Sequence, residues 1–146
     1  MEYRGVDFMV EKLSQALEPL LEEQGVWYVF GNQVEIKDGG KEVLKNGDIL
    51  TSAELSDIIA AGEKRHLICT YGTFGLFNAP EQACRMVNYS QFCKSSCRVA
   101  VNVIDNWVVR MYVKDEAMLQ RVFEYAKTVD PEAYLLTEED DLGIGN

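Results

Sequence analysis

Residues 98–114 have the sequence RVAVNVIDNWVVRMYVK, in which apolar side chains alternate with others on both sides of Asp105-Asn106. Alternation with a period of two is typical of β-strands, so this stretch predicts a β-hairpin. The alternating apolar residues all have odd numbers: Val99, Val101, Val103, Trp107, Val109, Met111 and Val113.

The odd numbering constrains the turn of this hairpin. The two apolar sets share one face only if the numbers of paired residues add up to an even number. A two-residue turn at Asp105-Asn106 pairs Ile104 with Trp107 and places the sets on opposite faces, whereas a loop of three or five residues keeps them together. We therefore predict a loop such as Asp105-Asn106-Trp107, with Val103 opposite Val109.

The even-numbered face of the hairpin is half polar and has no acid. Arginine and tyrosine among apolar neighbours are typical of a contact surface, so this face is our candidate partner-binding site. The alternative is that a helix of the same chain covers the face, with the long Arg and Lys stems lying along it. The candidate residues are Arg98, Asn102, Arg110, Tyr112 and Lys114, and the face also holds Ala100, Ile104 and Val108.

Before the hairpin, the sequence predicts a helix, a meander and two further helices. The first helix is capped by Asp7, kinked by Pro19 and ended by Gly25. Apolar and alternating patterns then predict strands over 26–30, 33–37 and 65–71, with turns at 31–32, 38–40 and 46–47. Thr51 to Glu54 form a capping box for the second helix, and Asn78 caps a third helix that runs from Pro80 to about residue 94.

After the hairpin we expect a helix capped by Asp115 and closed by Asp130-Pro131, and then a short strand or turn over 133–136. The fold class is α+β: one antiparallel sheet of about five or six strands with three to four helices packed on it. Residues 1–136 form a single domain, and residues 137–146 form a flexible acidic tail.

The order of helix, meander, helix, hairpin and helix resembles that of the small acidic homodimeric chaperones of secretion systems. The resemblance is one of topology and rests on no sequence motif. The helix over 51–61 is additional to the chaperone plan. The resemblance implies a protein partner and self-association as a homodimer.

The charge distribution favours a basic protein partner. The net charge is −10, and acids are concentrated in residues 1–24 and 115–146, whereas residues 82–104 contain none. An acidic surface disfavours direct binding to nucleic acid or to an anionic membrane, because phosphate groups need clustered bases. No apolar run is long enough to span a bilayer and no secretory signal is evident, so we expect a cytoplasmic protein with free thiols.

The four cysteines and the single histidine are the residues from which a zinc or catalytic site could be built. On one helix, Cys84 and Cys93 point to opposite faces, which leaves Cys93 and Cys97 as the pair able to share one. His66 and Cys69 lie three apart on a predicted strand, so they also point apart. Cys93 and Arg98 are separated by four residues, whereas phosphatase loops have five. No nucleotide-binding glycine motif is present, so we predict no cofactor, metal or catalytic residues.

The sequence therefore favours a non-enzymatic interaction protein, such as an adaptor, a chaperone-like protein or an inhibitor. It would use its acidic terminal helices and the cationic hairpin face. One alternative is a nucleic-acid mimic that inhibits a basic nucleic-acid-binding protein. The other is a small cysteine-dependent or zinc-binding enzyme.

Overall fold

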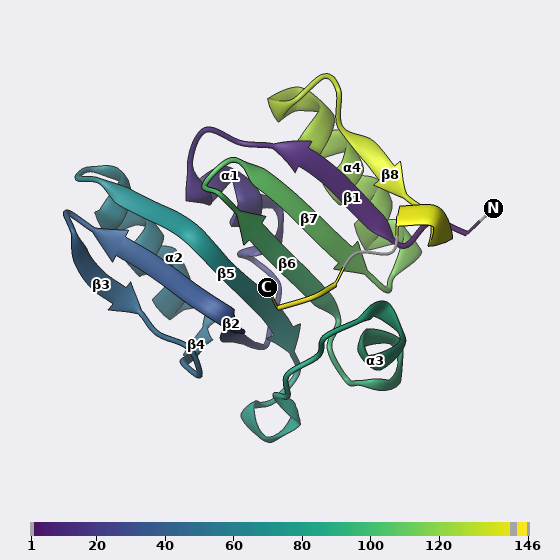
Figure 1. Ribbon diagram of the computed structural model, residues 1–146, viewed down its shortest axis with the longest axis horizontal. Coiled ribbons are helices and arrows are strands. Elements are labelled where there is room, and N and C mark those ends of the chain that lie inside the picture. Colours follow the sequence, from purple (N-terminus) through teal and green to yellow (C-terminus); the bar gives the residue numbers. More distant parts are fainter. Residues whose placement is uncertain (1, 141–142, 146) are drawn as a thin grey trace.

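A computed structural model of the chain describes residues 2–140 and 143–145. Its centre is an antiparallel sheet of eight strands in the order β3-β2-β5-β6-β7-β1-β8, with β4 paired to β2 beside this path (Figure 1). The expected α+β class is confirmed, with more strands than the five or six expected. The strands are β1 (Gly5–Met9), β2 (Val26–Asp38), β3 (Lys41–Leu44), β4 (Ile49–Thr51), β5 (Leu67–Phe77), β6 (Val99–Ile104), β7 (Val108–Val113) and β8 (Tyr134–Leu136).

Three α-helices cover one side of the sheet, which we call the helical face, and a fourth lies on the other side. The α-helices are α1 (Leu13–Leu17), α2 (Ser52–Glu63), α3 (Tyr89–Lys94) and α4 (Glu116–Val129), and the short 3-10 helices are η1 (Glu18–Leu20), η2 (Pro80–Gln82) and η3 (Glu138–Asp140). No helix in the part of the chain that the structure describes is long and apolar enough to cross a bilayer.

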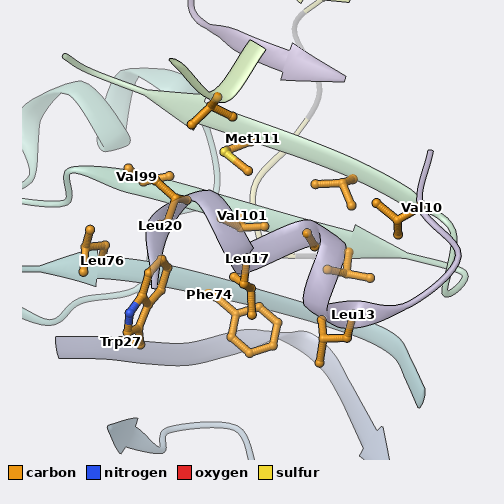
Figure 2. Close-up of a cluster of buried hydrophobic side chains, with 14 of the residues drawn as sticks. Val10, Leu13, Leu17, Leu20, Trp27, Phe74, Leu76, Val99, Val101 and Met111 are labelled. Atoms are coloured by element: carbon orange, nitrogen blue, oxygen red, sulfur yellow. The ribbon is translucent and has the colours of Figure 1, made fainter. Parts of the chain in front are cut away.

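The main core lies between the sheet and α1, α2 and α4. Figure 2 shows Leu13, Leu17 and Leu20 of α1 and η1 above Phe74 and Val101 of the sheet. The odd-numbered valines of the predicted hairpin share one face of the sheet. Because α1 and α4 cover this face, all of these valines are buried in the main core. Burying such side chains stabilises the fold by about 1.5–3 kcal/mol each.

The opposite face of the sheet, which we call the tail-side face, carries a second apolar cluster. Phe92 of α3, Met86 and Ile144 pack there against Phe30 and Tyr112 of the sheet. The segment that contains residues 143–145 lies over the middle strands (Figure 1). The backbone N–H of Asn32 donates to Gly145 O at 2.6 Å, and the N–H of Ile144 donates to Val87 O at 3.0 Å.

The predicted hairpin register is confirmed. Val103 pairs with Val109, and Ile104 pairs with Val108, so the loop is Asp105-Asn106-Trp107. Asp105 and Asn106 have φ values of 52° and 70°. Asp and Asn tolerate this left-handed conformation better than other non-glycine residues, which is why this pair can form the tight turn.

Two predicted helix starts are also confirmed. The Thr51 hydroxyl accepts the N–H of Glu54 at 3.1 Å, and the Glu54 carboxylate accepts the N–H of Thr51 at 2.9 Å. The Asp115 carboxylate accepts the N–H of Met118 at 2.9 Å at the start of α4. Both starts depend on contacts within four residues, so local sequence was sufficient to find them.

The predicted first helix is wrong in its first half. Asp7 does not cap a helix but lies in the middle of β1, and the helix begins at Leu13. The side chains of Val6, Phe8 and Val10 are buried, which is the period-two pattern of a strand. Pairing with both β7 and β8 outweighs the helical spacing that the same residues share with the later leucines.

The middle of the chain differs from the prediction at its glycines and in its third helix. Gly31-Asn32 is not a hairpin turn, because β2 continues through it with a shift of register after Phe30. The strand predicted over 65–71 continues past residue 71, through Gly72 and Gly75, to Phe77. The predicted helix 80–94 is two short pieces, η2 and α3, with irregular chain between them.

The end of the chain also departs from the expected free tail. Residues 138–140 form η3, and Ile144 has only 2% of its surface exposed. Residues 141, 142 and 146 of the predicted tail lie outside the described residues. The described part packs on the sheet because an apolar side chain and several backbone groups find partners there.

Candidate functional site

Cross-strand pairing arranges the tail-side face in rows. One row, here called the polar row, consists of Tyr134, Asp7, Arg110, Asn102, Thr73 and Phe30, which stand side by side across six strands. Two of these residues, Asn102 and Arg110, belong to the predicted partner-binding set. The sheet therefore brings them beside residues that are distant in sequence, including Asp7.

A mostly buried ion pair lies in the polar row. Arg110 donates to Asp7 Oδ2 from Nε at 3.0 Å and from Nη2 at 2.8 Å. The two side chains are only 11% and 14% exposed. Nη2 also donates to the Tyr134 hydroxyl at 3.3 Å. Burial, together with the nearby Asp7 carboxylate, raises the pKa of the Tyr134 hydroxyl.

The amide of Asn102 joins the polar row to the C-terminal segment. Its Oδ1 accepts the Thr73 hydroxyl at 2.7 Å and the backbone N–H of Gly145 at 3.2 Å. Its Nδ2 donates to Arg110 O at 3.1 Å. Both ends of the amide are thus bonded within the chain, and Asn102 is 4% exposed.

The other three predicted partner-binding residues also have partners within the chain. Tyr112 is 1% exposed and packs against Phe92 and Tyr89 of α3, with ring centroids 6.0 and 5.4 Å apart. Lys114 donates to Ser95 O, and its ammonium lies 5.0 Å from the Phe92 ring. Arg98 pairs with Glu23 at 2.6 Å.

The expectation of a free hairpin face is therefore corrected. Asn102, Arg110 and Tyr112 are buried, and of the five predicted residues Arg98 and Lys114 retain accessible surface. The cover consists of α3 and residues 143–145, which is the alternative that the sequence left open, with the C-terminal segment added to the helix. The amphipathic pattern of a single hairpin is the same whether its second face is solvated or covered.

A second row on the same face remains open. It consists of Met9, Val108, Ile104, Tyr71 and Glu35, paired in that order across five strands, and is called the open row below. Met9 is 55% exposed, and Val108, Ile104 and Tyr71 are half-buried. The sequence prediction missed Met9 because it placed this residue in a helix, and it did not single out Tyr71, which ends the strand predicted over 65–71.

Acidic groups lie around the open row. The Tyr71 hydroxyl donates to Asp105 Oδ1 at 2.8 Å, and this bond raises the pKa of Tyr71. The backbone N–H of Met9 donates to Asp130 Oδ2 at 2.9 Å. Glu35 ends the row on β2. An apolar strip between carboxylates can hold an apolar surface that carries bases at its edges.

The cysteines occupy two kinds of environment. Cys69 and Cys97 are buried, and desolvation raises the pKa of each thiol to about 12, so both are protonated near neutral pH. Protonated thiols are poor nucleophiles and poor metal ligands. Cys84 and Cys93 are exposed. Within residues 2–140 and 143–145, no three His, Cys, Asp or Glu side chains are grouped so that they could hold a metal ion.

His66 lies differently from the prediction. It precedes β5 and is not part of the strand, so strand alternation does not separate it from Cys69. Both residues line one cavity on the helical face. With its thiol protonated, Cys69 does not form the activated pair that a cysteine nucleophile needs.

Comparison with known proteins places the chain in a family. The model of the family described as "Protein of unknown function (DUF2691)" matches residues 3–143, so the chain belongs to this family. No curated protein and no solved structure matches the chain.

Proposed function

We propose that this protein is a non-enzymatic interaction module that binds a basic, amphipathic segment of a partner protein over the open row. The observation that carries the proposal is the open row itself: four apolar or aromatic side chains lie side by side, without the cover that the polar row has. A row of this kind is suited to receiving the apolar side of a helix or strand.

Charge supports a basic partner. Glu35, Asp105 and Asp130 border the row, and the chain as a whole has a net charge of −10. Bases on either side of the partner's apolar stripe would meet these carboxylates. Such complementarity mainly speeds association and selects the partner, while the apolar contact supplies most of the affinity.

The same charges argue against a second copy of this chain as the occupant of the row. Two copies docked face to face would bring Glu35 and Asp105 of one close to the acids of the other. Like charges brought together cost several kcal/mol at an interface. The homodimer implied by the chaperone resemblance therefore has no support from this surface.

The free cysteines support a reducing compartment, and we place the protein in the cytoplasm. Cys84 and Cys93 are both exposed and unpaired. Exposed thiols persist in reduced form where glutathione and thioredoxin systems operate.

The test measures binding of a synthetic amphipathic peptide of leucine and lysine by fluorescence polarisation. Met9→Lys removes apolar area from the open row and repels a basic ligand, while the 55% exposure of Met9 leaves the fold intact. Ile49→Lys, at a residue 43% exposed on β4, is the matched control. Because burying a methionine contributes about 1.5–3 kcal/mol, we expect Met9→Lys to weaken binding about tenfold or more, with no change for Ile49→Lys.

Two results would contradict the proposal. One is an equal effect of the two substitutions, which would mean that the peptide binds through diffuse charge. The other is binding that does not weaken with salt, which would remove the role of the bordering acids. Competition by duplex DNA for a natural basic partner would distinguish a nucleic-acid mimic from an adaptor or chaperone-like protein.

A further inference from the structure

Residues 143–145 lie on the tail-side face in the way that a bound peptide lies on a protein. They form neither helix nor strand, and they cross the middle strands of the sheet (Figure 1). Their contacts come from β2, from the loop before α3 and from β6. We call the residues that make these contacts the C-terminal site: Phe30, Asn32, Met86, Val87 and Asn102.

Hydrogen bonds to its backbone hold the segment from both sides. The N–H of Asn32 donates to Gly145 O at 2.6 Å, and the N–H of Ile144 donates to Val87 O at 3.0 Å. The N–H of Gly145 donates to Asn102 Oδ1 at 3.2 Å. Asn32 lies between the two stretches over which β2 pairs with β5, so its N–H is available to the segment. Bonds of this kind are the same for every extended peptide, whatever its side chains.

Two positions of the segment set which sequences fit the C-terminal site. Ile144 is 2% exposed and belongs to the apolar cluster that contains Phe30 and Met86. Gly145 has φ at 75°, and a Cβ at this position would lie 3.1 Å from the Phe30 ring and 3.2 Å from Met86 O. Both the backbone angle and the close contacts favour glycine there. The sequence that fits is therefore a branched apolar residue followed by glycine.

The polar groups of the C-terminal site keep partners when the segment leaves. Asn102 Oδ1 also accepts the Thr73 hydroxyl at 2.7 Å, and Asn102 Nδ2 donates to Arg110 O at 3.1 Å. Asn32 and Val87 are exposed residues, so water can bond the backbone groups that the segment now bonds. The main cost of removing the segment is exposed apolar surface, which another segment of the same kind covers again. The segment can therefore be exchanged.

From these features we infer that the C-terminal site recognises an extended peptide of a partner protein in which a branched apolar residue precedes glycine. Residues 143–145 occupy the same site from within the chain and compete with the partner. Because they are tethered, their effective concentration is high, and the partner peptide binds tightly only where they are displaced. The inference does not rest on the proposed function, since the C-terminal site and the open row share no residue.

The test titrates the capped peptide Ser-Gly-Ile-Gly-Ser into the full chain while the Asn32 and Asn102 amide signals are followed by NMR. Ile144→Asp places a carboxylate in the apolar cluster and so displaces the segment. Ile49→Asp, at a residue 43% exposed on β4, adds the same charge elsewhere and is the matched control. We expect Ile144→Asp to bind the peptide about tenfold or more tightly than the wild type and Ile49→Asp do. Met9→Lys should bind it like the wild type.

Altered peptides test the two sequence requirements. Ser-Gly-Ser-Gly-Ser lacks the apolar side chain, and Ser-Gly-Ile-Ala-Ser brings a Cβ against the Phe30 ring, so both should bind Ile144→Asp about tenfold or more weakly. Gly145→Ala loosens the segment by the same contact and keeps every apolar side chain. It should therefore also bind Ser-Gly-Ile-Gly-Ser more tightly than the wild type, and it decides the question if Ile144→Asp does not fold. The inference is overturned if this peptide shifts neither signal in the folded variants, or if the altered peptides bind equally well.

Discussion

The polar row and the open row lie on the same face of the same sheet, two residues apart along β6 and β7. The row with more polar side chains is the buried one, and the row with more apolar side chains is the exposed one. Arg110 and Asn102 of the polar row are 9% and 4% exposed, whereas Met9 of the open row is 55% exposed. Polar side chains are buried where the chain supplies partners for them, and an apolar side chain stays exposed where no segment reaches it. The comparison teaches that the presence of a covering segment, and not the polarity of the side chains, decides which of the two rows is buried.

The largest effect is expected from breaking the ion pair of the polar row. Arg110→Ala leaves the mostly buried Asp7 carboxylate, which is 14% exposed, without its partner; this should lower the free energy of unfolding by about 3 kcal/mol, the low end for buried pairs. Urea denaturation measures the change. Lys12→Ala removes an exposed partner of Glu63 and should cost about 1 kcal/mol or less. Similar losses of free energy of unfolding in the two variants would mean that water reaches the Asp7–Arg110 pair more freely than its low exposure indicates.

A second test uses the Cys97 thiol beneath the cover. Burial raises its pKa to about 12, compared with about 8.5 in an unfolded chain. The folded state favours the neutral thiol. The thiol's contribution to the free energy of unfolding is therefore complete below about pH 8.5 and is lost as the pH rises towards 12. The loss is on the order of 4 kcal/mol. Urea titrations across this pH range should show a smaller decline in the free energy of unfolding for Cys97→Ala than for the wild type. Cys93→Ala, at an exposed thiol, should decline like the wild type.

The third test removes the apolar anchor of the C-terminal segment. Ile144 is 2% exposed among Phe30, Met86 and neighbouring side chains. Ile144→Ala should therefore cost about 2 kcal/mol, at the low end of large-to-small substitutions because the segment is terminal and can adjust. Hydrogen exchange of the Gly145 amide, which is bonded to Asn102, should become faster. Unchanged exchange at Gly145 would show that the segment is held by its backbone bonds alone.

The smallest effect is expected in the open row. Met9→Ala should change the free energy of unfolding by about 0.5 kcal/mol or less, because the side chain is more than half exposed. Measured beside Arg110→Ala, it sharpens the contrast between the rows: the polar residue stabilises the fold and the apolar one does not. A loss of about 2 kcal/mol for Met9→Ala would mean that the open row is covered in solution.

The elements that were predicted correctly depend on contacts close in sequence. The hairpin register followed from the odd numbering of its valines, and the starts of α2 and α4 followed from caps within four residues. The strand β1 was missed because Met9 and the later leucines share a helical spacing. The buried alternation of Val6, Phe8 and Val10 was the signal that could have found it.

The candidate site was harder to predict because its contacts are distant in sequence. Asp7 and Arg110 are 103 residues apart, and Asn102 and Gly145 are 43 apart. Each of these residues has a plausible role in its own local context, Asp7 as a helix cap and Gly145 as part of a solvated tail. No local pattern indicates that they meet on one sheet face.

By itself, the sequence determined the α+β class, the register of the hairpin and the caps of two helices, because side-chain periodicity and capping are local properties of the chain. Only the tertiary structure decided which half of the tail-side face is covered. That choice depends on the pairing of β1 with β7 and on the path of residues 143–145. A half-polar face has the same alternation under both outcomes, so its cover is decided by α3 and by residues 143–145, which are distant in sequence from most of the residues they cover.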